Sequence, residues 1–164
     1  MTKNCLACGG ELVGPVPQTV AYRALPGVEL VNVPVWTCSE CGEEEVGLPR
    51  LNELQRLLAQ LVARRPGRLA PAEIRFLRKH LGWNGRTFAA AFDVAPETVS
   101  RWENGERNMG PTAERLLRLC ATRLEPLTDF AELTPLLHAP SEEDGRDEPI
   151  RVELGPDSAW SEAA

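Results

Sequence analysis

The chain has 164 residues, with 18 lysine and arginine residues against 24 aspartate and glutamate residues, and 43% hydrophobic residues. No apolar run approaches the roughly 18 residues that a membrane-spanning helix needs. Cys5 and Cys8 stand where a secretory signal would carry a long apolar stretch, so we expect a soluble, cytoplasmic protein of at most two small domains. Five cysteines in such a chain favour metal ligation or free thiols over disulfides.

The net charge of -6 averages over three parts of different sign. Residues 1–64 carry five basic and seven acidic side chains, residues 65–125 carry eleven and seven, and residues 126–164 carry two and ten. Only the middle part, with a net charge of +4, is suited to bind a polyanion such as DNA.

The first 46 residues are rich in glycine, proline and β-branched residues, which predicts short strands around turns. Residues 19–25 and 28–36 are the best strands, and Pro26-Gly27 between them predicts a hairpin. Pro34 predicts an edge or bulged position for the second strand. Because two strands alone are marginally stable in water, this segment needs something other than a core to hold it together.

Leucine spacing predicts an amphipathic helix over residues 49–64, which the sequence Arg64-Arg65-Pro66-Gly67 ends. Four short helices follow, at residues 71–80, 85–92, 96–104 and 111–124, and a weaker one is expected at 127–137. The predicted fold class is α+β. A small zinc-bound β domain with a helix (residues 1–64) precedes an all-α helix-turn-helix domain (65–138) and a disordered acidic tail (139–164).

Two C-x2-C pairs, each followed by glycine, place Cys5 and Cys8, and Cys38 and Cys41, as candidate metal ligands. Two such turns give a closed site of four thiolates, which selects one structural zinc ion over harder ions. Unliganded thiols, an iron site and a redox switch are the alternatives. Cys120 lies on an apolar stripe and is expected to be a buried core thiol.

Residues 75–105 have the organisation of a helix-turn-helix, with a core of Phe88, Ala89, Phe92, Val99 and Trp102. Asp93 falls at the turn, where a left-handed conformation is usual. Arg78 and Glu103 are expected to pair between helices, and Trp83 to lie in the core.

The second helix presents polar residues away from that core. Arg101 is the candidate for bidentate reading of guanine, and Glu97 for a weaker contact with cytosine. The other candidate DNA contacts are Thr98, Ser100 and Asn104 on the same helix, and Asn84, Arg86 and Thr87, placed for phosphate contacts at the start of the preceding helix. The alternative is an ordinary solvated helix face.

The segment TVSRWENG (residues 98–105) resembles the end of the recognition helix in the Xre/Cro repressors. The first segment, with its paired cysteines and the final CGE at residues 41–43, resembles the YgiT-type zinc finger. Their order is similar to that of the MqsA family of antitoxins over residues 1–125. The resemblance implies an autorepressor whose zinc domain binds a ribonuclease toxin and whose helix-turn-helix domain dimerises on operator DNA. Arg101 matches that family's DNA-reading arginine, and Glu97 stands where Asn or Gln is frequent.

We therefore expect a dimeric DNA-binding repressor of antitoxin type with a palindromic operator. The alternatives are a zinc-dependent protein-interaction adaptor and a stand-alone regulator without a toxin. An enzyme is the least favoured class, because His80 and His138 have no nucleophile motif beside them and a closed thiolate site cannot activate water. The acidic tail is expected to serve solubility, with competition against DNA as the alternative.

Overall fold

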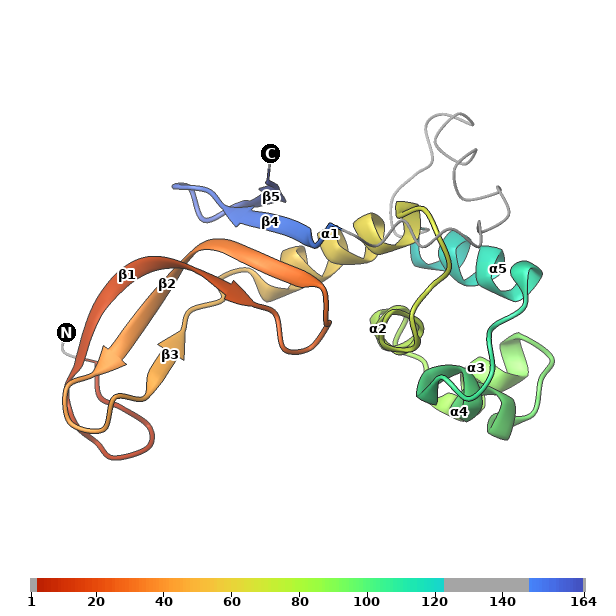
Figure 1. Cartoon of the computed structure of the whole chain (residues 1–164), viewed down its shortest axis with the longest axis horizontal. Helices are drawn as coiled ribbons and strands as arrows, with labels where there is room; N and C mark the ends of the chain where they lie inside the picture. The colour runs from red at the N-terminus through yellow and green to blue at the C-terminus, as the bar shows by residue number, and fades with distance from the viewer. Residues whose placement is uncertain (1–2, 123–147, 164) are drawn as a thin grey trace.

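A computed structural model describes residues 3–122 and 148–163. The strands β1 (Leu12–Ala21), β2 (Val28–Cys38) and β3 (Glu44–Val46) lie at one end of the molecule (Figure 1). Helix α1 (Leu51–Arg64) leads from them to the other end, which holds α2 (Pro71–His80), α3 (Gly85–Ala91), α4 (Pro96–Asn104) and α5 (Pro111–Thr122). Two further strands, β4 (Ile150–Leu154) and β5 (Trp160–Glu162), return to the sheet. A strand-rich region followed by a helical region confirms the predicted α+β class.

The predicted hairpin is present, but its first strand starts and ends earlier than expected. β1 and β2 pair antiparallel, with Leu12 opposite Cys38 and Ala21 opposite Glu29. The chain turns over residues 22–27, where Gly27 has a φ of 83°. Leu25, which was expected in the strand, lies in this turn and is buried in the core. Because burial of the Leu25 side chain in the core is favourable, the chain leaves the strand at Ala21, before Pro26 and Gly27.

Pro34 was expected to make β2 an edge or bulged strand, and the edge alternative is wrong, because β2 lies in the middle of the sheet. The bulged alternative agrees with the structure, since the pairing of β2 with β1 has an extra β2 residue between Leu30 and Val33. β1 pairs with one side of β2, while β4 and β3 pair with the other side over residues 28–31 and 35–37. Pro34 falls between these two ladders, so its missing N–H breaks no strand pairing there. Its carbonyl accepts a hydrogen bond from the Gly47 N–H at 2.8 Å. A central strand thus tolerates proline at the position where one neighbouring strand, β4, ends and the next, β3, begins.

The expected disorder of the tail is wrong for residues 148–163. β4 runs parallel to β2 and β5 pairs antiparallel with β4. Val152 is fully buried, and Trp160 is 6% exposed with its indole N–H 2.7 Å from the Pro49 carbonyl. These two apolar residues anchor the segment although its average composition is acidic. The helix expected at residues 127–137 and the rest of the predicted tail up to residue 147 lie outside the described residues.

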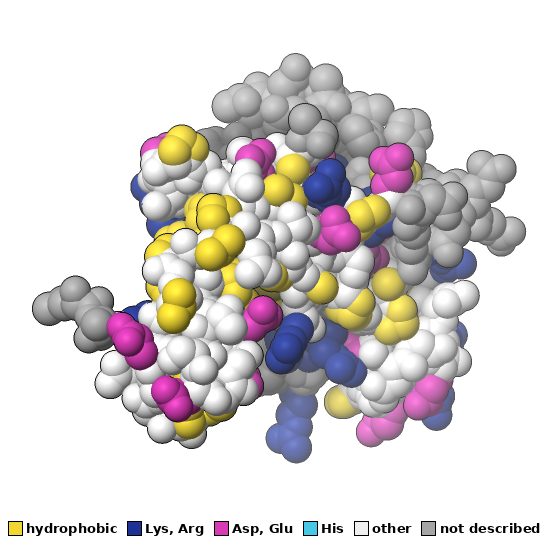
Figure 2. Space-filling view, turned by 60° about the vertical axis from the view of Figure 1, so that its left-hand side comes forward, with side chains coloured by type: hydrophobic (Ala, Val, Ile, Leu, Met, Phe, Trp, Pro, Cys, Tyr) yellow, Lys and Arg dark blue, Asp and Glu magenta, His cyan; other side chains and the backbone are white. Residues whose placement is uncertain are grey.

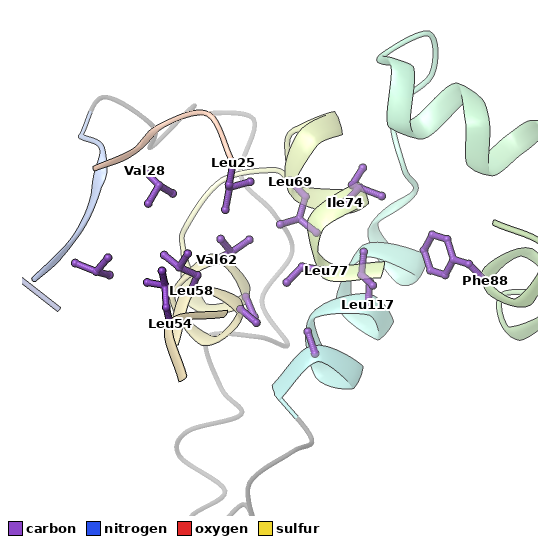
Figure 3. Packing of buried hydrophobic residues seen from close by; sticks show 14 of the residues in the cluster. Leu25, Val28, Leu54, Leu58, Val62, Leu69, Ile74, Leu77, Phe88 and Leu117 are labelled. Atoms are coloured by element: carbon purple, nitrogen blue, oxygen red, sulfur yellow. The ribbon is translucent and has the colours of Figure 1, made fainter. Parts of the chain in front are cut away.

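Helix α1 belongs to a single hydrophobic cluster that includes residues from both ends of the molecule. Leu54, Leu58 and Val62 recur every four residues along one stripe and are fully buried. Figure 3 shows Leu25 and Val28 to one side of this stripe and residues of α2 and α5 to another. The sheet and the helical domain therefore share one core through α1.

The four short helices begin where the sequence predicts and end within two residues of the predicted positions. Pro71 and Pro96 are the first residues of α2 and α4, where proline costs no hydrogen bond. The Asn84 side chain accepts a hydrogen bond from the Thr87 N–H and caps α3. Gly105, with a φ of 75°, ends α4 in the left-handed conformation.

The junction between α1 and the helical domain contains a buried ion pair, Glu114–Arg118, at 2.9 Å. Both side chains lie almost wholly out of solvent. The Arg118 guanidinium donates to the carbonyls of Ala63 (2.9 Å), Arg65 (2.7 Å) and Gly67 (2.7 Å), and Glu114 accepts from the Leu69 N–H at 2.8 Å. Arg118 thereby binds one carbonyl in the last turn of α1 and two in the loop that follows it.

We expect Arg118→Ala to lower the free energy of unfolding by roughly 3–5 kcal/mol, because it leaves Glu114 charged, buried and unpaired. Chemical denaturation followed by circular dichroism measures this loss. Arg118→Met combined with Glu114→Gln is the control, since it removes both charges and should cost less. An equal or larger loss in this double variant would contradict the assignment of the penalty to the orphaned carboxylate.

We expect Trp160→Ala to destabilise the protein by roughly 3–5 kcal/mol, because a buried indole leaves a cavity between β5 and α1. Trp160→Phe keeps most of the apolar contact and loses the hydrogen bond to Pro49, so its cost should be smaller. Denaturation curves of the two variants test the docking of the C-terminal strands. If Trp160→Ala unfolds at the same denaturant concentration as the wild type, that docking is refuted.

Candidate functional site

The four predicted metal ligands come together at the far end of the hairpin from α1. All four sulfur atoms of Cys5, Cys8, Cys38 and Cys41 lie within 4.8 Å of one another. The separations are 3.8 Å for Cys5–Cys41, 3.5 Å for Cys8–Cys38 and 3.4 Å for Cys8–Cys41. A tetrahedral ion with metal–sulfur bonds of about 2.3 Å requires sulfur separations of about 3.8 Å. The four cysteines can therefore hold a metal ion.

Each cysteine pair lies on a tight turn that depends on the glycine after it. The Gly9 N–H donates to the Cys5 carbonyl at 2.9 Å, and the Gly42 N–H donates to the Cys38 carbonyl at 3.0 Å. Gly9 and Gly42 have φ values of 78° and 73°, which side chains with a Cβ rarely adopt. The two turns therefore have the same backbone geometry and aim their sulfurs at one point.

The Cys38 and Cys41 thiols differ in acidity because backbone N–H groups dominate at Cys38, whereas neighbouring sulfur atoms dominate at Cys41. N–H groups of Cys41 and Glu40 lower the pKa of the Cys38 thiol to about 7. The Glu43 N–H acts to lower the pKa of the Cys41 thiol, but its contacts with the Cys8 and Cys38 sulfurs outweigh that and raise it to about 12. Four thiolates this close repel one another, so full ionisation needs a cation among them.

The end of the hairpin that carries the four cysteines is separate from the main core. Cys5, Leu12 and Cys38 form a small buried cluster of their own, against which Trp36 packs. The Lys3 ammonium lies 4.0 Å from the centre of the Trp36 ring and 3.3 Å from Glu45. So few apolar contacts cannot hold this end alone, and a bound ion would supply the missing stability.

We expect the reduced protein to bind Co²⁺ with the absorption of a tetrahedral thiolate complex, and Cys38→Ser to lose it. Protons compete with the metal for the thiolates, so the affinity should fall as the pH drops below 7. Cys120→Ser is the matched control, because Cys120 is half-buried on α5 and lies outside the four-cysteine cluster. Equal Co²⁺ binding by both serine variants would exclude the tetrathiolate site.

The helix-turn-helix core is as the sequence predicts. Phe88, Val99 and Trp102 are buried, and the Phe88 and Phe92 rings meet edge to face with centroids 4.4 Å apart. Asp93, in the turn between α3 and α4, has a φ of 50° and confirms the expected left-handed residue. This core fixes the angle at which α4 is presented.

The predicted pairing of Arg78 with Glu103 is confirmed, and it is part of a larger network. Arg78 contacts both Glu103 oxygens, one at 3.1 Å, and donates to the Trp83 carbonyl at 2.7 Å. Arg75 adds a second ion pair with Glu103 at 3.3 Å. Sequence reasoning missed Arg75, although its position three residues before Arg78 puts both on the same side of α2. Two cations on α2 thus hold the C-terminal half of α4.

The candidate base-contacting residues lie on the solvent side of α4. Glu97, Ser100, Arg101 and Asn104 are exposed, whereas Thr98 is half-buried. Asn104 is already engaged, since its amide donates to the Ser100 hydroxyl at 3.3 Å and accepts from Arg75 at 3.1 Å. Within the described chain the Arg101 side chain has no hydrogen-bond or ion-pair partner. Arg101 is therefore an exposed cation on this face whose donors are free within the described residues.

The candidate phosphate-contacting residues gather beside α4. Asn84 caps α3 through the Thr87 N–H at 2.9 Å and also accepts from the Thr87 hydroxyl at 3.1 Å, so both side chains have a structural role. Arg86 is exposed next to them. Asn84, Arg86 and Ser100 line one recess of about 480 Å³, which brings the start of α3 and the face of α4 together.

Residues 74–122 match the family model described as Helix-turn-helix, a stretch that runs from Ile74 within α2 to Thr122 in α5. No curated protein and no solved structure matches the chain. The match and the exposed α4 define a helix-turn-helix domain and support a DNA-binding transcriptional regulator, a class that is typically not enzymatic. Among the described helices, none has the length and apolar character needed to cross a bilayer.

Proposed function

We propose that this protein is a cytoplasmic, sequence-specific transcriptional repressor that reads operator DNA with α4. The observation that carries the proposal is Arg101, which is exposed and has no partner among the described residues, on the second helix of a helix-turn-helix domain. In this class the second helix lies in the major groove, where an arginine can donate two hydrogen bonds to guanine. Arg101 is accordingly the principal base-reading residue.

The neighbouring residues are proposed to contact either base edges or phosphates, and they differ in how directly they do so. Glu97 and Ser100 accept or donate at base edges from the exposed face of α4, and Thr98 contributes from its half-buried position. Asn104 serves first to tie Ser100 to Arg75, so its contact with DNA is secondary. The phosphate contacts come from Arg86, supported by the Asn84 and Thr87 cap.

Operator binding is proposed to involve a homodimer. Two recognition helices about 34 Å apart enter successive major grooves of a palindromic site. Leu116 supports a contact between protomers through α5, because it is 42% exposed on that helix.

The metal is proposed to be one structural zinc ion held by Cys5, Cys8, Cys38 and Cys41. Four thiolates form a soft, closed donor set, which suits zinc and leaves no position for water or substrate. Zinc bound there would stabilise the hairpin end without chemistry of its own.

The strand-rich region of residues 1–64 is proposed to bind a protein partner. If the protein is an antitoxin, this partner is a toxin. β1 is an edge of the sheet, so one side of its backbone is available for pairing. Val13 and Val16 on β1 are 62% and 56% exposed, and Leu6 on the first cysteine turn is 92% exposed. Figure 2 shows hydrophobic side chains gathered over this part of the surface. The same surface would serve an adaptor that does not use DNA, which is the alternative function.

We expect Arg101→Ala to abolish sequence-specific binding to DNA from upstream of the protein's own gene, because each bidentate guanine contact contributes about 1–3 kcal/mol of discrimination. Fluorescence anisotropy with an unrelated duplex as competitor, at two salt concentrations, measures the loss. Arg64→Ala, an exposed cation at the end of α1, is the control. Specific binding retained by Arg101→Ala rejects the base-reading role, and no specific binding by the wild type favours the adaptor.

A further inference from the structure

A basic pocket of about 460 Å³ lies between the β1–β2 turn and α2. The turn contributes Arg23 and Tyr22, and α2 contributes Arg75, Phe76, Lys79 and His80. None of the described residues that line the pocket is acidic. In Figure 2, lysine and arginine side chains gather between the strand part and the helical part of the molecule.

The positive charge of this pocket is largely uncompensated. The Arg23 and Lys79 side chains are exposed and have no ion pair or hydrogen bond within the described chain. Burial lowers the pKa of His80, and the neighbouring Arg56 guanidinium lowers it further.

We propose that this pocket binds a phosphate group. Arginine and lysine supply charge-assisted hydrogen bonds to phosphate oxygens, and here they come from two elements that face each other across the pocket. The half-buried Tyr22 and Phe76 provide apolar surface for the group that carries the phosphate. Phe76 is held in a stack with His80, with ring centroids 6.5 Å apart and planes inclined by 19°. The phosphate belongs either to a DNA backbone or to a free nucleotide.

The pocket is connected to the recognition helix through Arg75. The Arg75 guanidinium donates to the Asn104 side chain at 3.1 Å and to the Glu103 carbonyl at 3.2 Å, at the C-terminal end of α4. A phosphate in the pocket competes with these acceptors for the same guanidinium. Phosphate binding is therefore coupled to the position of α4, while the contacts themselves are separate from base reading by Arg101.

The test compares full-length wild type with Arg23→Ala/Lys79→Ala. Arg64→Ala/Arg151→Ala is the matched control, since it removes two exposed cations from a different surface. One arm measures binding to a duplex of unrelated sequence over a range of salt, so it does not depend on operator reading. The other measures binding of adenosine triphosphate and of inorganic pyrophosphate by calorimetry. Circular dichroism verifies that both variants are folded.

If the phosphate belongs to DNA, the slope of log affinity against log salt should fall by about 2 in Arg23→Ala/Lys79→Ala and less in the control. If it belongs to a free nucleotide, adenosine triphosphate or pyrophosphate should bind about tenfold or more weakly to that variant than to the control. When neither the slope nor the binding of either probe distinguishes the two variants, the phosphate site is refuted. That result would leave the role of Arg101 untouched.

Discussion

Helix α1 has to bury residues against the sheet and against the helical domain at the same time, and backbone carbonyls at its C-terminal end then meet the buried Arg118. Leu54, Leu58 and Val62 supply the apolar contact. The Arg118 guanidinium on α5 donates to the Ala63 carbonyl in the last turn of α1, and Glu114 neutralises the Arg118 charge. Because an unpaired carbonyl or charge at this junction would be costly, the two parts of the protein are held in one arrangement.

The hairpin obtains stability from two different sources along its length. Near α1, Leu25, Val28 and Leu30 join the main core, and the C-terminal strands cover the other edge of β2. At the far end, the described part of the chain buries a small separate cluster around Cys5 and Cys38. A metal ion at the four sulfurs would act where the apolar core no longer reaches, which explains why the cysteine turns lie at that end.

The helical domain separates residues that hold α4 from residues that are free to bind. Glu103 faces inward to Arg75 and Arg78, whereas Arg101, two residues earlier, faces solvent. Arg75 belongs to both surfaces, because it touches the end of α4 and lines the basic pocket below the β1–β2 turn. That turn brings the strand part next to the domain that we propose binds DNA. Communication between a partner on the strands and DNA on α4 would have a short physical route here.

The sequence by itself determined the features that depend on near neighbours. Proline and glycine positions set the ends of α2 and α4. Cysteine spacing predicted the two turns whose four sulfurs can hold a metal ion, and helical periodicity predicted the core around Phe88 and Trp102. The roles of Arg101 and its neighbours in DNA binding stay predictions. Tertiary structure alone decided the central place of β2, the docking of residues 148–163 and the positions of Arg75 and Arg118. The reason is that these depend on partners far along the chain, such as Val28 with Ile150, whose pairing leaves no periodic pattern in either segment.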